Sequence, residues 1–162
     1  MNVEITKTGI LVDGKEVYLA GGDIHYYRIL PKGWRRRLEL AKDFGLTAVQ
    51  TYVPWHLHEK KEGEFDFSGH LNLAAFLELC KEMGLYVMLR PSPHITSECD
   101  LGGIPGWVYK DETVHARCAD PHYMACIEKY YARLCPEFVP YLATNGGPII
   151  MLQCATQTGN FA

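Results

Sequence analysis

The sequence lacks several features that would place a protein at once in a large class. It has no excess of positive charge, because 16 lysines and arginines stand against 19 acidic residues, for a net charge of −3. Proteins that bind nucleic acid or anionic membranes use a basic field, so neither partner is expected. No apolar run approaches the ~20 residues that span a bilayer. The start, Met1-Asn2-Val3-Glu4, lacks the basic and apolar regions of a signal peptide, which predicts a cytoplasmic location.

The six cysteines also lack the CxxC spacing of zinc ribbons and redox motifs. Cys80, Cys126 and Cys135 fall inside helical patterns, where buried free thiols are expected. We therefore predict that the protein binds no cofactor and is located in a reducing compartment.

Hydrophobic periodicity predicts a single domain over residues 1–162, with a β-hairpin lead-in at 1–19 and a β-α-β-α-β-α-β order over 20–162. Asp13-Gly14 is the hairpin turn signal. Strands are expected over 18–26, 47–53, 85–89 and 149–153, with helices over 34–44, over 69–83 and from 121. Ser68 and Asp120 are the predicted caps of the second and third helices. The three apolar stripes are Trp34, Leu38 and Ala41; Leu73, Phe76, Leu77, Cys80 and Met83; and Ile127, Tyr131, Leu134 and Phe138.

This α/β alternation predicts parallel strands joined by right-handed crossovers. Four such strands fit either a small open sheet or half of an eight-stranded barrel, and periodicity does not choose between them. The segments that follow strands are long and rich in aromatic, His, Pro and Gly residues, whereas those that follow helices are short. That asymmetry favours a barrel whose C-terminal face carries the site.

Polar and aromatic side chains follow every predicted strand. Aromatic faces stack on the C–H face of a pyranose while acids bind its hydroxyls, so this mixture indicates a sugar site. Core packing is the alternative for any single aromatic residue, but the whole collection on one face favours a pocket. His25 and Arg28 are expected to be structural and to pair with nearby carboxylates. The collection is His25, Tyr26 and Arg28; Tyr52, Trp55, His56, His58 and Glu59; Arg90, His94, Glu98, Cys99, Asp100 and Trp107; and Gln153, Cys154, Thr156 and Gln157.

Several long motifs, in order, resemble family 35 glycoside hydrolases, the β-galactosidases. They are HYYR at 25–28, TYVPWHLHE at 51–59, GEFDFSG at 63–69, LRPSP at 89–93, GGIPGW at 102–107 and GGPII at 146–150. The resemblance covers nearly the whole chain. It implies a TIM-type (β/α)8 barrel, of which this chain holds the hairpin and strands one to four, and a retaining mechanism whose nucleophilic glutamate belongs on strand seven. It also implies that Tyr52 and Glu98 contact galactose. Trp107, from the aromatic collection, and Thr156, at the family's asparagine position, are further predicted sugar contacts.

The chain departs from the family pattern where three strand ends would meet. Thr156-Gln157 stands where members carry Asn-Glu, the glutamate being the acid/base. His56 replaces an asparagine, and His94, Thr96, Cys99 and Cys154 replace a tyrosine, a cysteine, a tryptophan and a valine. The flanking sequence keeps the family pattern. Decay of an active site and deliberate alteration of one both fit this distribution.

Three functions remain open at this point. The first is a β-galactosidase-type hydrolase segment that is inactive alone, since Gln157 has no titratable proton and general acid–base help is worth about 10²–10⁴ in rate. The second is a non-catalytic galactoside-binding fragment. The third is a metal site built from His56, His94, Cys99 and Cys154, for which tolerated replacement is the favoured alternative. Exposed strand edges further predict self-association.

Overall fold

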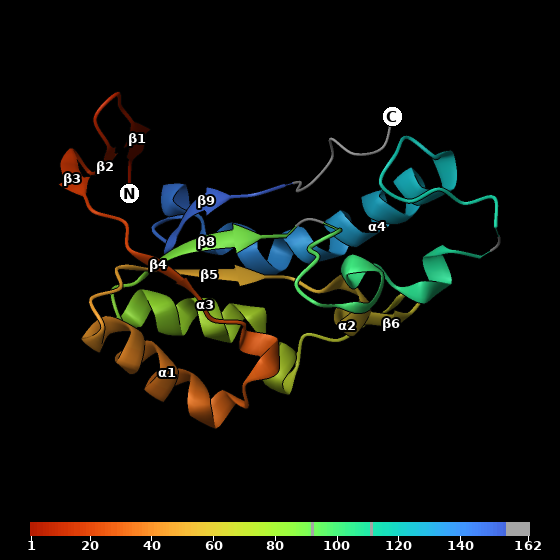
Figure 1. The fold of residues 1–162 in the computed structure, drawn as a ribbon, viewed down its shortest axis with the longest axis horizontal. Helices are drawn as coiled ribbons and strands as arrows, with labels where there is room; N and C mark the ends of the chain where they lie inside the picture. Colours follow the sequence, from red (N-terminus) through yellow and green to blue (C-terminus); the bar gives the residue numbers. More distant parts are fainter. Residues whose placement is uncertain (92, 111, 155–162) are drawn as a thin grey trace.

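The computed structural model of the chain describes residues 1–91, 93–110 and 112–154, and Thr156 and Gln157 therefore lie outside the described residues. Its centre is a parallel sheet in the order β4 (Gly21–Asp23), β5 (Ala48–Tyr52), β8 (Tyr86–Arg90) and β9 (Ile149–Leu152). Three helices connect these strands: α1 (Pro31–Asp43), α3 (Leu73–Glu82) and α4 (Pro121–Phe138). Figure 1 shows the strands side by side, with the helices grouped along them. The predicted alternation of parallel strands and helices is confirmed.

The helices cover one face of this sheet and leave the other open. Val49, Val87 and Leu89 are buried in one core with residues of all three helices. Strand residues alternate between faces, so Gln50 and Met88 point the opposite way. A hollow of about 470 Å³ lies on that second face, lined by Ile5, Gln50, Met88, Leu89, Arg90, Ile150, Met151, Leu152 and Gln153. The face that would line the inside of a barrel is thus the face that carries polar groups.

A small antiparallel sheet precedes the parallel one. The predicted hairpin turn is confirmed, since Asp13 and Gly14 both have positive φ and connect β2 (Ile10–Val12) to β3 (Lys15–Val17). A third strand, β1 (Val3–Ile5), pairs with β2 and was not predicted separately. The N-terminal amine donates to the carbonyl of Ala143 at 2.8 Å and ties this sheet to the segment before β9.

Helix α1 has the predicted apolar stripe and end, but it begins at Pro31, before the predicted start at Trp34. Pro31 occupies the first turn, where a missing N–H costs nothing. Trp34, Leu38 and Ala41 are its buried residues. Gly45 has a φ of 84° and donates to the carbonyl of Lys42 at 2.8 Å, which ends the helix.

The second predicted helix is wrong at its start. A 3₁₀ helix, η2 (Gly69–Leu71), comes first, and α3 begins only at Leu73. The cap is Asn72, whose side chain accepts from the amide of Ala75 at 2.9 Å. Ser68 does not cap it because its hydroxyl donates to the Asp66 carboxylate at 2.7 Å. The apolar stripe from Leu73 to Cys80 is buried as expected.

The stripe predicted for the third helix is right at Leu134 and Phe138 but wrong in its first half, and its cap is right. Asp120 accepts from the amide of Tyr123 at 2.9 Å, as expected. Ile127 and Tyr131 are only partly buried, and the core face instead runs through Tyr123, Cys126, Tyr130, Leu134 and Phe138. Tyr130 sets the face of α4 that is turned toward the core, because it is fully buried and stacks on Trp55 with the ring centres 4.6 Å apart.

The first parallel strand is shorter than predicted. The extended run expected over 18–26 becomes β4 of three residues, followed by the 3₁₀ helix η1 (Tyr26–Arg28). The remaining short elements are α2 (Trp55–His58), β6 (Glu59–Lys61), β7 (Glu64–Phe65), η3 (Asp100–Gly103), η4 (Gly106–Val108), η5 (Val139–Tyr141) and η6 (Ala143–Asn145). No helix in the described ranges is long and apolar enough to cross a membrane.

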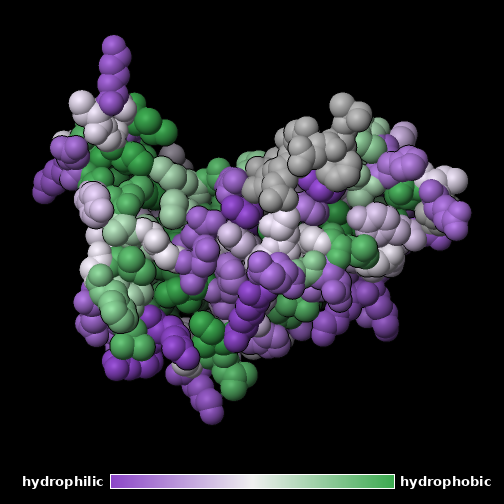
Figure 2. All heavy atoms as spheres, in the orientation of Figure 1, coloured by the Kyte–Doolittle hydropathy of each residue, from purple (hydrophilic) through white to green (hydrophobic). Residues whose placement is uncertain are grey.

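The cysteines are all free. Cys80 and Cys126 are buried and Cys135 is half-buried, which confirms the prediction of core thiols. Apolar side chains also reach the surface: Ile5 is 81% and Phe44 85% exposed. Figure 2 shows apolar residues gathered along the left of the view, over the N-terminal sheet and the neighbouring end of the parallel sheet.

Candidate active site

The register of the parallel sheet brings four polar side chains into one row. Asp23 pairs with Gln50, so His25 continues level with Tyr52, which itself pairs with Arg90. Leu89 pairs with Leu152, which brings Gln153 level with Arg90. Parallel strands end at the same edge, and residues in one row point to the same face. The row His25, Tyr52, Arg90 and Gln153 therefore crosses the C-terminal ends of β4, β5, β8 and β9.

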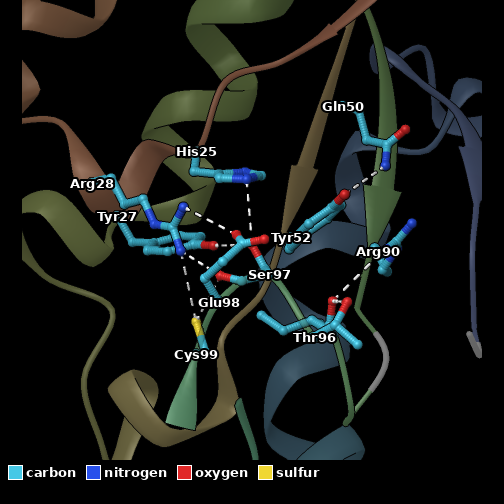
Figure 3. A network of polar contacts seen from close by, with 11 residues as sticks. His25, Tyr27, Arg28, Gln50, Tyr52, Arg90, Thr96, Ser97, Glu98 and Cys99 are labelled. Carbon is cyan, nitrogen blue, oxygen red and sulfur yellow. Dashed lines mark hydrogen bonds and ion pairs between the residues drawn. The ribbon is translucent and has the colours of Figure 1, made fainter. Parts of the chain in front are cut away.

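Stacking holds the row together. The His25 ring lies 4.6 Å from the Tyr52 ring and 5.3 Å from the Tyr27 ring, to which it is nearly parallel. The Arg90 guanidinium lies over the other side of Tyr52, with its carbon 4.1 Å from the ring centre. Arg28 lies 5.5 Å from the centre of Tyr27. Figure 3 shows the three rings between these two arginines. Such cation–π contacts are worth about 0.5–2 kcal/mol each, depending on how far they are desolvated.

Hydrogen bonds fix the same groups at their edges. The Tyr52 hydroxyl accepts from the Gln50 side-chain amide at 3.0 Å. Arg90 Nε donates to the Gln153 side-chain oxygen at 2.9 Å. Each donor comes from the open face of the sheet, and Gln50, Arg90 and Gln153 line the hollow on that face.

His25 is kept neutral at the centre of the stack. Burial lowers the pKa of its imidazole, and the nearby Arg28 guanidinium lowers that pKa further. Its Nε2 lies 3.4 Å from the Ser97 hydroxyl, which is 3.3 Å from the Tyr27 hydroxyl. Both hydroxyls and a neutral imidazole nitrogen can donate or accept, so the three groups form one hydrogen-bonded chain from Tyr27 through Ser97 to His25. Burial also raises the pKa of Tyr27, which keeps its proton in place.

Glu98 stands at the rim of this arrangement. Its side chain is 90% exposed, and its carboxylate lies 4.0 Å from the guanidinium of Arg28. The expectation that Arg28 pairs with a nearby carboxylate is confirmed. Because Glu98 adjoins Ser97, the stack of rings and the exposed acid belong to one network (Figure 3). A neutral hydroxyl-rich ligand would meet phenol, amide, guanidinium and carboxylate groups here.

Comparison with known sequences identifies the family. The model of glycosyl hydrolases family 35 matches residues 9–160. The chain belongs to glycosyl hydrolase family 35.

Curated relatives agree with this assignment. Beta-galactosidase 8 of Oryza sativa subsp. japonica is 43% identical over 150 residues, which is 92% of this chain and 22% of the relative. The beta-galactosidase of Felis catus is 42% identical over 151 residues, or 93% of this chain and 23% of that protein. Beta-galactosidase-1-like protein 3 of Homo sapiens is 41% identical over 155 residues, or 96% and 24%. This family 35 chain spans about a quarter of the length of these relatives.

Solved structures support the fold alone. The exo-beta-1,4-mannosidase Op5Man5 from Opitutaceae bacterium strain TAV5 superposes with a TM-score of 0.71 at 16% identity, over 95% of this chain and 28% of that one. GH5_18 from Streptomyces cattleya gives a TM-score of 0.62 at 14% identity, over 85% and 33%. The predicted TIM-type barrel fold is confirmed, with the four strands as its partial sheet.

The predicted sugar contacts do not all lie together. Tyr52 and Glu98 both belong to the network around His25. Trp107 instead packs edge-on against Trp55, and its indole N–H donates to the backbone carbonyl of Glu59 at 2.9 Å. In this arrangement the polar edge of Trp107 is occupied by the protein itself. Thr156 and Gln157 lie outside the described residues, so their placement stays a prediction.

The four metal candidates point to separate partners. His56 Nδ1 donates to the Gly103 carbonyl at 3.3 Å, and the ring of His94 packs so closely on Gly102 that an added Cβ there would lie 2.2 Å from it. Cys99 Sγ lies 3.5 Å from the Ser97 carbonyl, whereas Cys154 is exposed. No three His, Cys, Asp or Glu side chains within 1–91, 93–110 and 112–154 are grouped as metal ligands. The cluster on which the metal hypothesis depended is therefore not formed by the described residues.

Three members of the network were missed by sequence reasoning. Gln50 lies inside a strand, Tyr27 lies next to two residues that were singled out, and Ser97 precedes Glu98. For Gln50 the available signal was its polarity in a run of buried residues, AVQTY. No sequence signal pointed to Tyr27 and Ser97, because their roles depend on the contact between the segments that follow β4 and β8.

A second network of hydrogen bonds is buried next to the first and fixes the segment that carries Tyr27 and Arg28. The Tyr26 hydroxyl lies 2.6 Å from His58 Nε2, and His58 Nδ1 lies 2.8 Å from the carbonyl of Asp66. A carbonyl can only accept, so Nδ1 carries the proton and Nε2 accepts from Tyr26. Burial lowers the pKa of His58 to about 4. The bond joins η1, which carries Tyr27 and Arg28, to the segment after β5.

Acid is expected to weaken the fold through His58. The unfolded chain binds a proton near pH 6.5 and the folded chain only near pH 4. The contribution of His58 to the free energy of unfolding is therefore complete above pH 6.5. It falls as the pH decreases, by roughly 3 kcal/mol when pH 4 is reached. The lowered pKa values of His25 and His56 act in the same direction. Urea unfolding measured from about pH 7.5 to about pH 4.5 reports this slope.

His58→Gln should flatten that pH dependence while lowering stability at neutral pH, because it removes the titrating group from a buried hydrogen-bonded position. His70→Gln is the matched control, since His70 is exposed on η2, and it should keep the wild-type slope. Equal slopes for His58→Gln and the wild type would contradict the assignment.

Proposed function

We propose that this chain is the N-terminal segment of a β-galactosidase-type catalytic barrel and that it contributes one wall of a site for terminal β-galactosides. Family membership and the row of polar groups across the strand ends support this proposal. The observation that carries it is the meeting of Tyr52 and Glu98 in one network, since the family resemblance assigns both to galactose. Thr156, and more peripherally Trp107, complete the proposed set of contacts.

Hydrolysis of a glycoside needs more catalytic groups than we assign to this segment. A retaining glycosidase uses two carboxyl groups about 5 Å apart, one as nucleophile and one as acid and then base. Gln157 occupies the acid/base position by sequence and has no proton to transfer. The nucleophile belongs on a later strand, and the relatives are about four times longer than this chain. We propose that the 162-residue polypeptide binds galactosides without cleaving them.

Hydrolysis of a nitrophenyl β-galactoside by the purified chain should stay at the level of the buffer blank. Gln157→Glu should remain equally inactive, because restoring one carboxyl does not supply the second. Turnover above the blank by the unmodified chain would overturn the claim that it is catalytically silent. Turnover by Gln157→Glu alone would instead show that a nucleophile is already present.

Binding is the positive test of the proposal. Galactose, but not glucose, should shift the amide NMR signals of residues around Tyr52 and Glu98. Glu98→Gln should weaken galactose binding by about tenfold or more, the change expected when a hydrogen bond to a charged group is lost. Glu128→Gln, an exposed glutamate on α4, is the matched control and should bind like the wild type. Equal affinity for the two sugars, or for Glu98→Gln and the wild type, would contradict a galactose site.

Self-association is a further part of the proposal. Within the described residues, β4 and β9 each have a neighbour on one side only, and unpaired strand edges are templates for other chains. Ile5 and Phe44 are exposed apolar side chains, and apolar residues gather along the left of the view in Figure 2. Light scattering after size-exclusion chromatography measures the resulting mass. The cytoplasmic location stays a prediction, for which the six free thiols are the supporting observation.

A further inference from the structure

We propose that Arg28 is a positioning residue that holds the turn at residues 96–98 in its left-handed conformation and thereby presents the Glu98 carboxylate to a sugar. This assignment rests on the proposed function, since it concerns the same site. Arg28 itself reaches the turn from η1, which follows the first strand of the sheet.

The turn has an unusual backbone. Thr96, Ser97 and Glu98 have φ values of 58°, 45° and 48°, although none of them is glycine. The left-handed region places Cβ close to the following carbonyl oxygen, so L-residues visit it singly and at a cost in free energy. Three in succession persist only where the surroundings hold them.

The guanidinium of Arg28 makes several of the contacts that hold the turn in this conformation. Arg28 Nη2 donates to the carbonyl of Ser97, in the middle of the turn, and Nη1 forms the ion pair with Glu98 at 4.0 Å. Nη2 also lies 4.0 Å from Cys99 Sγ, at the end of the turn. These contacts follow one another along the chain, as Figure 3 shows. A planar fork with several N–H donors can bond a carbonyl and face a carboxylate at once, whereas an ammonium is a single point charge.

Arg28 is in turn held by the rest of the site. Its guanidinium lies by the ring of Tyr27, which stacks on His25. The Tyr27 hydroxyl and His25 Nε2 both contact the Ser97 side chain, so the turn is held through its side chain as well as its carbonyl. The ion pair alone would contribute little, because Arg28 is 44% and Glu98 90% exposed. The bond to the Ser97 carbonyl is therefore the contact that sets the backbone.

Amide hydrogen exchange tests the assignment without any sugar. The Cys99 amide donates to the Thr96 carbonyl at 2.9 Å, across the turn. Its exchange in the full chain should speed up by about tenfold or more in Arg28→Ala, which loses a charge-assisted hydrogen bond. Arg28→Lys, which keeps one charge, should give a smaller increase. The Val108 amide, which bonds to Pro105 in the next loop, should exchange at the wild-type rate in every variant and so reports that the fold is intact.

Arg37→Ala is the matched control. Arg37 lines the same hollow as Arg28, between β4 and α1, but comes from the helix and has no contact with the turn among those found in the structure. Its removal should leave exchange at Cys99 unchanged. Unchanged exchange in Arg28→Ala, or equal acceleration in Arg37→Ala, would overturn the assignment.

A double-mutant cycle on galactose affinity then separates positioning from general stability. Arg28→Ala should weaken galactose binding to the same degree as Glu98→Gln, and the double variant should lose no more than either single variant, because both remove the same carboxylate contact. Fully additive losses would overturn the assignment. If the wild type binds no galactose, the proposed function fails, while the exchange comparison still decides whether Arg28 holds the turn.

Discussion

One row of stacked side chains across the strand ends is the contact on which the rest of the site depends. His25, Tyr52 and Arg90 stand level because the register of β4, β5 and β8 places them so. Their stacking then fixes Tyr27 on one side and the Arg90–Gln153 hydrogen bond on the other. A shift of one strand by one residue would send that strand's member of the row to the helix-covered face. The site is therefore as rigid as the sheet beneath it.

The neutrality of His25 is part of this rigidity. Two guanidinium groups flank the stack, and a protonated imidazole between them would repel both. Burial and the field of Arg28 favour the uncharged ring, which shares a hydrogen bond with Ser97 and does not repel the arginines over Tyr27 and Tyr52. The electrostatic interactions and the register of the sheet therefore favour the same arrangement of side chains. The loop that carries Ser97 and Glu98 is attached through that neutral ring.

The features that the sequence predicts correctly are those with a local cause. Helix α1 has an apolar stripe and a glycine just past its end, and each acts within a few residues. The stripe of α4 was misassigned because both Ile127 and Tyr130 fit helical spacing, and only the distant Trp55 decides which is buried. The turn at 96–98 carries no glycine, so nothing local indicates its positive φ values. Trp107 fits a sugar pocket by composition, yet its indole N–H bonds to the backbone of Glu59.

Binding and chemistry have separate physical origins in this fold. The row from His25 to Gln153 is set by main-chain pairing within the sheet, which any side chains with the same burial pattern would preserve. A proton donor has no such support, since it depends on one titratable group beyond the end of β9 and on a second carboxyl about 5 Å away. A glutamine at the proposed acid/base position, 157, would lack that proton, while the pairing of the sheet strands does not depend on it. Under the proposed function, the segment would lack its acid while its polar row persists, and affinity for a galactoside is the property that such a row would retain.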